Sequence, residues 1–201
     1  VLERLFAGHP YGRSVFGERD SLAAASVEAL RDFCRPHLLP ERCALAVVGD
    51  FILADIEAEV RRNWSPLRRG LTAAAELPEA GRLERSRDDE VELDVEGCHL
   101  FIGWRAPAFN DPQRLPFSLL AHLLGGGLNP LLNGVLRGGR ALADSVRLDY
   151  LPMRAGGVAL LHMTLERRNV RAAKSELALF LNGVGSFHFS PQDVPPRLRA
   201  G

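Results

Sequence analysis

The chain has 201 residues, of which 46% are hydrophobic and 25% are charged, values typical of a globular protein that buries a core. Its 25 basic and 25 acidic residues leave a formal net charge of zero. Nucleic-acid and membrane-surface binders normally carry a basic excess, so the sequence predicts no nucleic-acid partner and no membrane partner. No apolar run reaches the roughly 20 residues that span a bilayer.

The ends of the sequence and its cysteines say little about the compartment. The chain begins at Val1 without a methionine or a signal peptide, so we expect a segment of a longer protein. Three cysteines, Cys34, Cys43 and Cys98, are too few and too widely spaced for a disulfide framework or a CxxC metal site. Each lies in an apolar segment, which predicts buried thiols. A soluble protein of the bacterial cytoplasm or the periplasm fits equally well.

The first third of the chain predicts a helix, a buried strand and a second helix. Ser26 is a favourable N-cap, and apolar residues follow it at helical spacing as far as Pro36. The apolar run 43–50 ends in Gly-Asp and is typical of a strand buried on both faces. Apolar residues recur every four positions over 52–64 and predict an amphipathic helix of about three turns.

Residues 65–90 lose all apolar periodicity and are punctuated by proline and glycine. A structureless stretch of this length is uncommon inside a compact domain, so we interpret it as a linker. It divides a first unit, 1–64, from a second unit, 91–185. The tail, 186–201, is rich in proline and is expected to be loose.

The second unit combines period-two and helical patterns. Strands are predicted at 91–95, 98–105, 144–151 and 157–165, and helices at 111–125, after 129, and from 169 to 183. Strands in consecutive pairs followed by helices favour an α+β fold, an antiparallel β-sheet with helices packed on one face.

The sequence contains no motif that would form a complete active site within this chain. The six histidines occur singly, without an H-x-x-E-H motif, so the chain itself predicts no metal site; they are His9, His37, His99, His122, His162 and His188. Gly125, Gly126 and Gly127 end a predicted helix, whereas a phosphate-binding loop opens one. No G-x-S-x-G motif is present for serine catalysis. No catalytic residue is therefore assigned.

Two stretches of sequence resemble a known family, the M16 zinc metallopeptidases (relatives of pitrilysin, insulinase and mitochondrial processing peptidase). The first combines His9-Pro10-Tyr11-Gly12 with the run 44–50, which ends in Val-Val-Gly-Asp. The second comprises 101–107, 110–112 and 119–146, and it is similar to that family's LGGG…L…LR…GLAYSV block. These matches occur in the family's order and cover most of the chain.

The resemblance implies a fold of the LuxS/MPP-like metallohydrolase type and a place for this chain within the enzyme. In the family, the H-x-x-E-H motif lies upstream of the HPYG-like segment, so zinc is expected only in an upstream domain or partner subunit. The chain resembles the C-terminal segment, known as the inactive domain. It would contain the end of the first unit over 1–64, an interdomain linker over 65–90, and a second, non-zinc unit over 91–185.

The resemblance also suggests substrate-binding residues. In the family, an arginine and a tyrosine seven residues later face the substrate across the chamber. Arg137 stands at the arginine position, but Asp144 stands where tyrosine is expected. An ion pair between Arg137 and Asp144 would also draw the guanidinium away from substrate. Gly125, Gly126 and Gly127 lie near the substrate path in relatives and are weaker candidates for contact.

Two functions remain open from the sequence. The preferred one is a non-catalytic domain of an M16 peptidase or inactive homologue, which helps to form the peptide-binding chamber and pairs with a zinc-bearing domain or subunit. The alternative is a structural or assembly subunit on the same scaffold, with proteolysis lost. A peptide substrate is expected only in the full assembly, and a homodimer stays open.

Overall fold

The chain folds into two compact units. A computed structural model describes residues 1–66, 76–81, 83, 85–126 and 130–184. One unit, called here the sheet unit, contains Val1–Arg13 and Leu77–Gly201, and the other, the helical unit, contains Ser14–Glu76. This division differs from the sequence-based one, because the first thirteen residues and the second half of the expected linker both pack with the sheet. The expected tail lies outside the described residues.

Hydrogen bonds and ion pairs hold Pro78 and residues 88–90 on the sheet unit. The buried His9 donates from Nε2 to the Pro78 carbonyl at 2.9 Å, while its Nδ1 accepts from the Tyr11 amide. Three consecutive acidic residues each meet a basic side chain: Asp88 with Lys174, Asp89 with Arg4, and Glu90 with Arg167. Proline and glycine content indicates that a segment lacks regular structure, and it does not exclude contacts of this kind.

Three antiparallel strands form the sheet, in the order β1-β3-β2. They are β1 (Cys98–Ala106), β2 (Ser145–Leu151) and β3 (Gly157–Leu165). The central β3 pairs along its length with both neighbours, so that His162 lies opposite Phe101 on one side and Arg147 on the other. The predicted strands over 98–105, 144–151 and 157–165 are confirmed within one or two residues.

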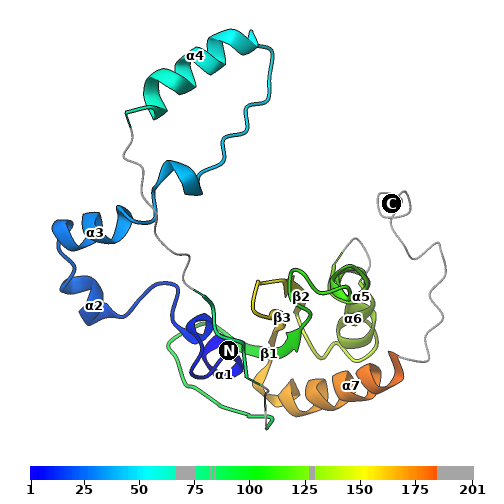
Figure 1. The fold of residues 1–201 in the computed structure, drawn as a ribbon. Helices are drawn as coiled ribbons and strands as arrows, with labels where there is room; N and C mark the ends of the chain where they lie inside the picture. Colours follow the sequence, from blue (N-terminus) through cyan, green and yellow to red (C-terminus); the bar gives the residue numbers. More distant parts are fainter. Residues whose placement is uncertain (67–75, 82, 84, 127–129, 185–201) are drawn as a thin grey trace. The chain divides into compact units, whose positions relative to one another are not determined.

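Helices cover one face of this sheet and enclose the main core. They are α5 (Arg114–Gly125), α6 (Leu131–Asn133) and α7 (Val170–Gly183), with α7 drawn in orange in Figure 1. Alternate residues of β3 point to this face and are buried against the helices; the cluster contains Leu161, Met163 and Leu165 with Leu124, Leu132, Leu136, Ala173 and Leu177. The α+β class and the antiparallel sheet with helices on one face are confirmed.

The opposite face of the sheet is covered at one end. There α1 (Leu2–Leu5) lies beside β1 in Figure 1, and Leu5 and Phe6 pack against Val158 in a second, smaller core. A short 3-10 helix, η1 (Pro10–Gly12), follows, with Tyr11 against the same cluster. The other end of this face carries Phe101, which is 48% exposed.

One prediction about the sheet unit is wrong, and one predicted helix begins later in the chain. Residues 91–95 alternate in polarity, yet they form no strand; Val91, Leu93 and Val95 are all exposed. Alternating polar and apolar residues give a segment two different faces, but a β-strand also needs a neighbouring strand to which its backbone can hydrogen-bond. The helix predicted from 111 begins instead at Arg114. Pro116 therefore falls in the first turn, where its missing N–H removes no helical hydrogen bond.

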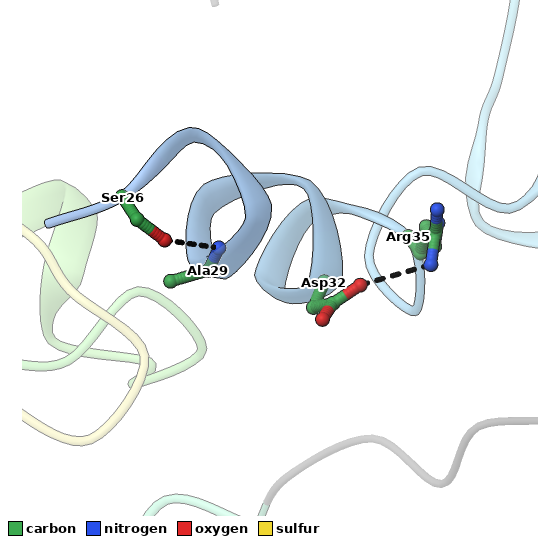
Figure 2. Close-up of polar contacts among 4 residues, drawn as sticks. All are labelled: Ser26, Ala29, Asp32 and Arg35. Carbon is green, nitrogen blue, oxygen red and sulfur yellow. Dashed lines mark hydrogen bonds and ion pairs between the residues drawn. The ribbon is translucent and has the colours of Figure 1, made fainter.

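The helical unit contains α2 (Arg19–Ala23), α3 (Val27–Cys34), a 3-10 turn η2 (Pro40–Arg42) and α4 (Leu53–Trp64). Ser26 caps α3 as predicted, because its Oγ accepts a hydrogen bond from the Ala29 amide at 3.1 Å (Figure 2). Asp32 and Arg35, one turn apart, form an ion pair at 2.9 Å on the same helix. The predicted amphipathic helix over 52–64 is confirmed as α4.

The apolar run 43–50 is extended but is not a strand. The prediction of a strand buried on both faces is wrong here: Leu45 is 52% exposed and Val48 is 97% exposed, and no strand pairs with them in the part of the chain that the structure describes. Cys34 and Cys43 are exposed as well, contrary to the expectation of buried thiols. Among the described residues, no helix is both long and apolar enough to cross a membrane.

Candidate functional site

Arg137 lies in a π-helix, η3 (Gly134–Gly139), which continues directly from α6. Three glycines in this six-residue segment weaken the preference for an α-helix, and π-helical turns occur frequently at functional sites. The buried Leu132 and Leu136 anchor the segment in the main core. Arg137 itself is exposed. The fold thus presents its guanidinium outward from a firmly packed support.

Asp144 lies at the far end of the loop that follows η3. The Leu136 carbonyl accepts hydrogen bonds from the amides of Leu142 and Ala143, at 2.9 and 3.1 Å, which closes this loop. The Asp144 amide then donates to the Thr164 carbonyl of β3 at 2.8 Å. The carboxylate, by contrast, is exposed. Arg137 and Asp144 are therefore held at the two ends of one closed loop, each with its charged group in solvent.

No ion pair joins Arg137 to Asp144 within the described ranges. The neighbouring Arg140 pairs instead with Glu176 of α7, at 3.6 Å, from the same loop. Ala141 has a φ of +47°, in the left-handed region where alanine is strained by about 1–3 kcal/mol. Such strain concentrates at functional sites. The Arg137 guanidinium thus forms no ion pair with the acidic side chains of the described ranges.

The glycines at the end of α5 have a packing role. A Cβ on Gly125 would meet Leu148 of β2, 2.7 Å from its amide nitrogen and 2.9 Å from its Cα, so only glycine allows α5 to approach the strand this closely. Gly126 is the C-cap, and its amide donates to the His122 carbonyl. Gly127 lies outside the described residues. The close approach of α5 to β2 explains the glycine at position 125, and the end of the helix explains the glycine at position 126.

Two histidines meet on the uncovered end of the sheet. His99 of β1 and His162 of β3 share a hydrogen bond of 3.0 Å between Nδ1 and Nε2, and the Phe101 ring stacks on His162 with centroids 4.3 Å apart. Burial lowers the pKa of His162 below its usual value, and the charges of His99 and Arg147 lower it further. Asp149 opposes this shift. His162 therefore favours its neutral form at neutral pH.

The sequence analysis missed this histidine pair. The available signal was the alternation in β1, which puts His99 and Phe101 on one face, but the register with His162 comes only from strand pairing. Two histidines fall short of a zinc site, which needs three protein ligands or more. No group of three or more histidine, cysteine or acidic side chains is placed to hold a metal ion in the ranges described.

Comparisons with known proteins show the family to which this chain is related. A sequence model of the peptidase M16 inactive domain matches residues 24–195. The chain belongs to the peptidase M16 family. It is 34% identical over 147 residues to the uncharacterized zinc protease ML0855 of Mycobacterium leprae, and 35% identical over 147 residues to the uncharacterized zinc protease Rv2782c of Mycobacterium tuberculosis. The match covers 72% of this chain in both cases, but only 33% and 34% of the two relatives.

Solved structures agree with this assignment at the level of the fold. The peptidase M16 inactive domain from Pseudomonas fluorescens superposes with a TM-score of 0.75 at 21% identity, covering 90% of this M16 chain and 45% of that one. A protease from Helicobacter pylori gives a TM-score of 0.76 at 18% identity, covering 94% and 47%. This M16 chain thus spans about a third of the curated relatives' length and about half of each solved chain.

Proposed function

We propose that this inactive M16 domain pairs with a zinc-bearing M16 domain or subunit and lines the peptide-binding chamber between them. One observation carries the pairing: the helical unit contributes no residue to the buried hydrophobic core of the described chain. A folded unit that leaves its apolar side chains in water is typical of an interaction surface. The alternative, a structural subunit without proteolysis, shares the pairing and differs in the chemistry of the chamber.

The exposed side of α3 is a regular apolar stripe. Val27, Leu30 and Phe33 follow one another three residues apart and are therefore neighbours on one helix face. They are 58%, 56% and 68% exposed, respectively. The charged pair of Asp32 and Arg35 in Figure 2 shows that the same helix has a polar side suited to water. An amphipathic helix of this kind buries its apolar face against a partner.

The extended run before α4 adds a second apolar surface. Leu45, Val47 and Phe51 line a shallow hollow together with Ile56 and Val60 of α4. Backbone groups in the run 44–48 form no strand ladder with the described residues. An extended apolar segment with free backbone donors and acceptors is suited to adding a strand to a partner's sheet.

The chamber surface is proposed to include Arg137 and the uncovered end of the sheet. Arg137 is a cation on a packed support, able to bind a peptide carbonyl or carboxylate. His99, Phe101 and His162 provide aromatic surface and hydrogen-bonding ring nitrogens on the sheet face opposite the main helices. The described residues do not fit a zinc site, so the metal and its activated water are assigned to the partner.

Substitution of Phe33 in the full-length protein tests the pairing. In the isolated 201-residue chain, Phe33→Ser is expected to change the free energy of unfolding by less than about 0.5 kcal/mol, because the side chain is exposed. In the full-length protein, combined with its zinc-bearing subunit where the zinc motif lies on a separate chain, the same substitution is expected to cost about 2 kcal/mol, the value of a fully buried Phe. Both are measured by urea unfolding.

Leu179→Ser is the matched control, because Leu179 on α7 is 69% exposed and Phe33 is 68% exposed. We expect Leu179→Ser to be nearly neutral in both settings. Equal and small effects of Phe33→Ser in the isolated chain and in the full-length protein would show that no other domain covers α3, and the proposed pairing would be wrong.

A further inference from the structure

A hollow of about 730 Å³ lies where the end of β1 meets the turn between β2 and β3. Most of its lining residues have small side chains, among them Ala80, Ala155 and Gly156, and polar and apolar atoms contribute equally to its surface. One charged side chain, Arg105 of β1, lines it as well. The hollow therefore combines small aliphatic side chains with exposed polar atoms and a single cation.

Three contacts fix the position of the Arg105 guanidinium. Nε donates to the Leu5 carbonyl at 2.8 Å, and Nη2 donates to the Gly81 carbonyl at 3.3 Å. Its Cζ lies 3.6 Å from the centroid of the Phe6 ring, so the planar group rests on the aromatic face. A side chain held in this way loses little further entropy when a ligand binds.

The guanidinium retains unused donors and an uncompensated charge. A guanidinium has five N–H donors, and the two carbonyls use two of them. No carboxylate of the described residues pairs with Arg105. The pKa of Arg105 is lowered by burial, which reflects the cost of holding this cation partly out of water. An anion would offset that cost.

Gly156 keeps the Nη1 edge of the guanidinium open. A Cβ at this position would lie 3.5 Å from Nη1, and the φ of +145° is one that other residues rarely adopt. The free N–H groups on Nη1 and Nη2 form the fork that matches the two oxygens of a carboxylate. The small side chains of the wall leave room for a methyl or ethyl group beside that carboxylate.

We propose that Arg105 and this hollow form a binding site for a carboxylate attached to a small apolar group. Two sources offer this chemistry: the free C-terminus of a peptide that ends in a small residue, and a short-chain aliphatic acid. The carboxylate oxygens accept from Nη1 and Nη2, and the aliphatic group contacts Ala80 and Ala155. The site lies within the sheet unit, so binding requires no second domain.

Ligand titration of the 201-residue chain, followed by amide NMR shifts of Ala106 and Gly156, tests the site. The probes are N-acetyl-trialanine with a free carboxylate, the same peptide as its C-terminal amide, and propionate. We expect the amide to bind at least about tenfold more weakly than the acid, since it lacks the charge that Arg105 recognises. A tenfold preference for the peptide acid over propionate identifies peptide ends as the source, and equal binding identifies small acids.

Three variants separate binding from folding. Arg105→Lys keeps the charge but lacks the fork, and is expected to weaken binding of the acid at least about fivefold. Ala80→Leu narrows the hollow beside the guanidinium without altering Arg105, and it is expected to weaken binding of the acid similarly. Arg154→Gln removes an exposed arginine next to the same turn and should leave binding unchanged.

Two results would overturn the proposal: equal affinity for the peptide acid and its amide, or unchanged affinity in both Arg105→Lys and Ala80→Leu. Arg105 would then serve only to hold the Leu5 and Gly81 carbonyls in place. Neither result bears on the pairing of the helical unit, because that pairing is measured at Phe33 in the full-length protein.

Discussion

Gly125→Ala is expected to destabilise the sheet unit because α5 packs on β2 through this glycine. The added Cβ would lie 2.7 Å from the Leu148 amide nitrogen and 2.9 Å from its Cα, and backbone atoms cannot turn aside as a side-chain end can. Overpacking of a core costs about 1–3 kcal/mol, and rigid neighbours favour the upper end. Alanine recovers up to about 1 kcal/mol of helix preference. The net expected loss is therefore about 2 kcal/mol.

Urea unfolding of the 201-residue chain, monitored by Trp104 fluorescence, measures this loss. Trp104 belongs to β1 and packs on the main core, so its signal reports on the sheet unit. A Trp64→Phe background removes the second tryptophan, which lies in α4. A shift of about 2 kcal/mol corresponds to a melting temperature lower by about 4–8 °C in a protein of this size.

Gly134→Ala is the matched control, because Gly134 is also helical but a Cβ there would meet nothing within 4 Å. It is expected to be neutral or to stabilise by about 0.4–1 kcal/mol. If Gly125→Ala falls within 0.5 kcal/mol of the parent, the close packing of α5 on β2 does not require glycine. The role of Gly125 would then have to be sought in substrate contact.

Three further predictions concern the exposed charges and the histidine pair. In the full-length protein with its zinc-bearing domain, Asp144→Tyr should raise chelator-sensitive peptide turnover at least about tenfold, since tyrosine can donate to an oxyanion. Arg137→Ala should lower the same turnover. Unchanged kcat and KM in both variants would favour the assembly role. The pKa of His162 is lowered in the folded state, so its contribution to stability is present above its unfolded pKa and is lost as the pH falls. Urea unfolding at pH 8 and pH 5 should show a smaller loss on acidification in His162→Gln, and an equal loss would contradict the shift. Asp89→Asn removes the half-exposed pair with Arg4 and should cost less than about 1 kcal/mol at low salt and less at high salt; a salt-independent loss would rule out an electrostatic origin.

Local signals in the sequence predicted most helices and three of the strands. Ser26 caps α3 because a hydroxyl before a helical apolar pattern satisfies a free amide, and this information is entirely local. The strands that form are those with a partner in the described chain. The run 43–50 and residues 91–95 have equally clear patterns but lack a pairing strand, and pairing is a long-range property that one segment cannot encode.

The residues of the candidate site also differ in how far the sequence could identify them. Arg137 and Asp144 were identified only through the family resemblance, because nothing in the composition of this loop distinguishes it from other surface loops. Arg105 was not singled out, since its surroundings come from residues about 100, 24 and 51 positions away in the sequence. Recognition of such a cluster requires the register of β1 against β3 and the path of the segment before β1.

In the sequence, the helical unit lies between two segments of the sheet unit, which ends its first segment at Arg13 and begins its second at Leu77. The hydrogen bond from His9 to the Pro78 carbonyl joins the segment before the helical unit to the segment after it, and both segments belong to the sheet unit. The sheet unit is therefore continuous across this hydrogen bond, on both sides of the stretch 14–76. A short glycine-serine bridge from Arg13 to Leu77 closes a much smaller loop at little entropic cost. Excision of residues 14–76 should therefore leave a sheet unit that folds on its own, with Arg105, Arg137 and the histidine pair in place.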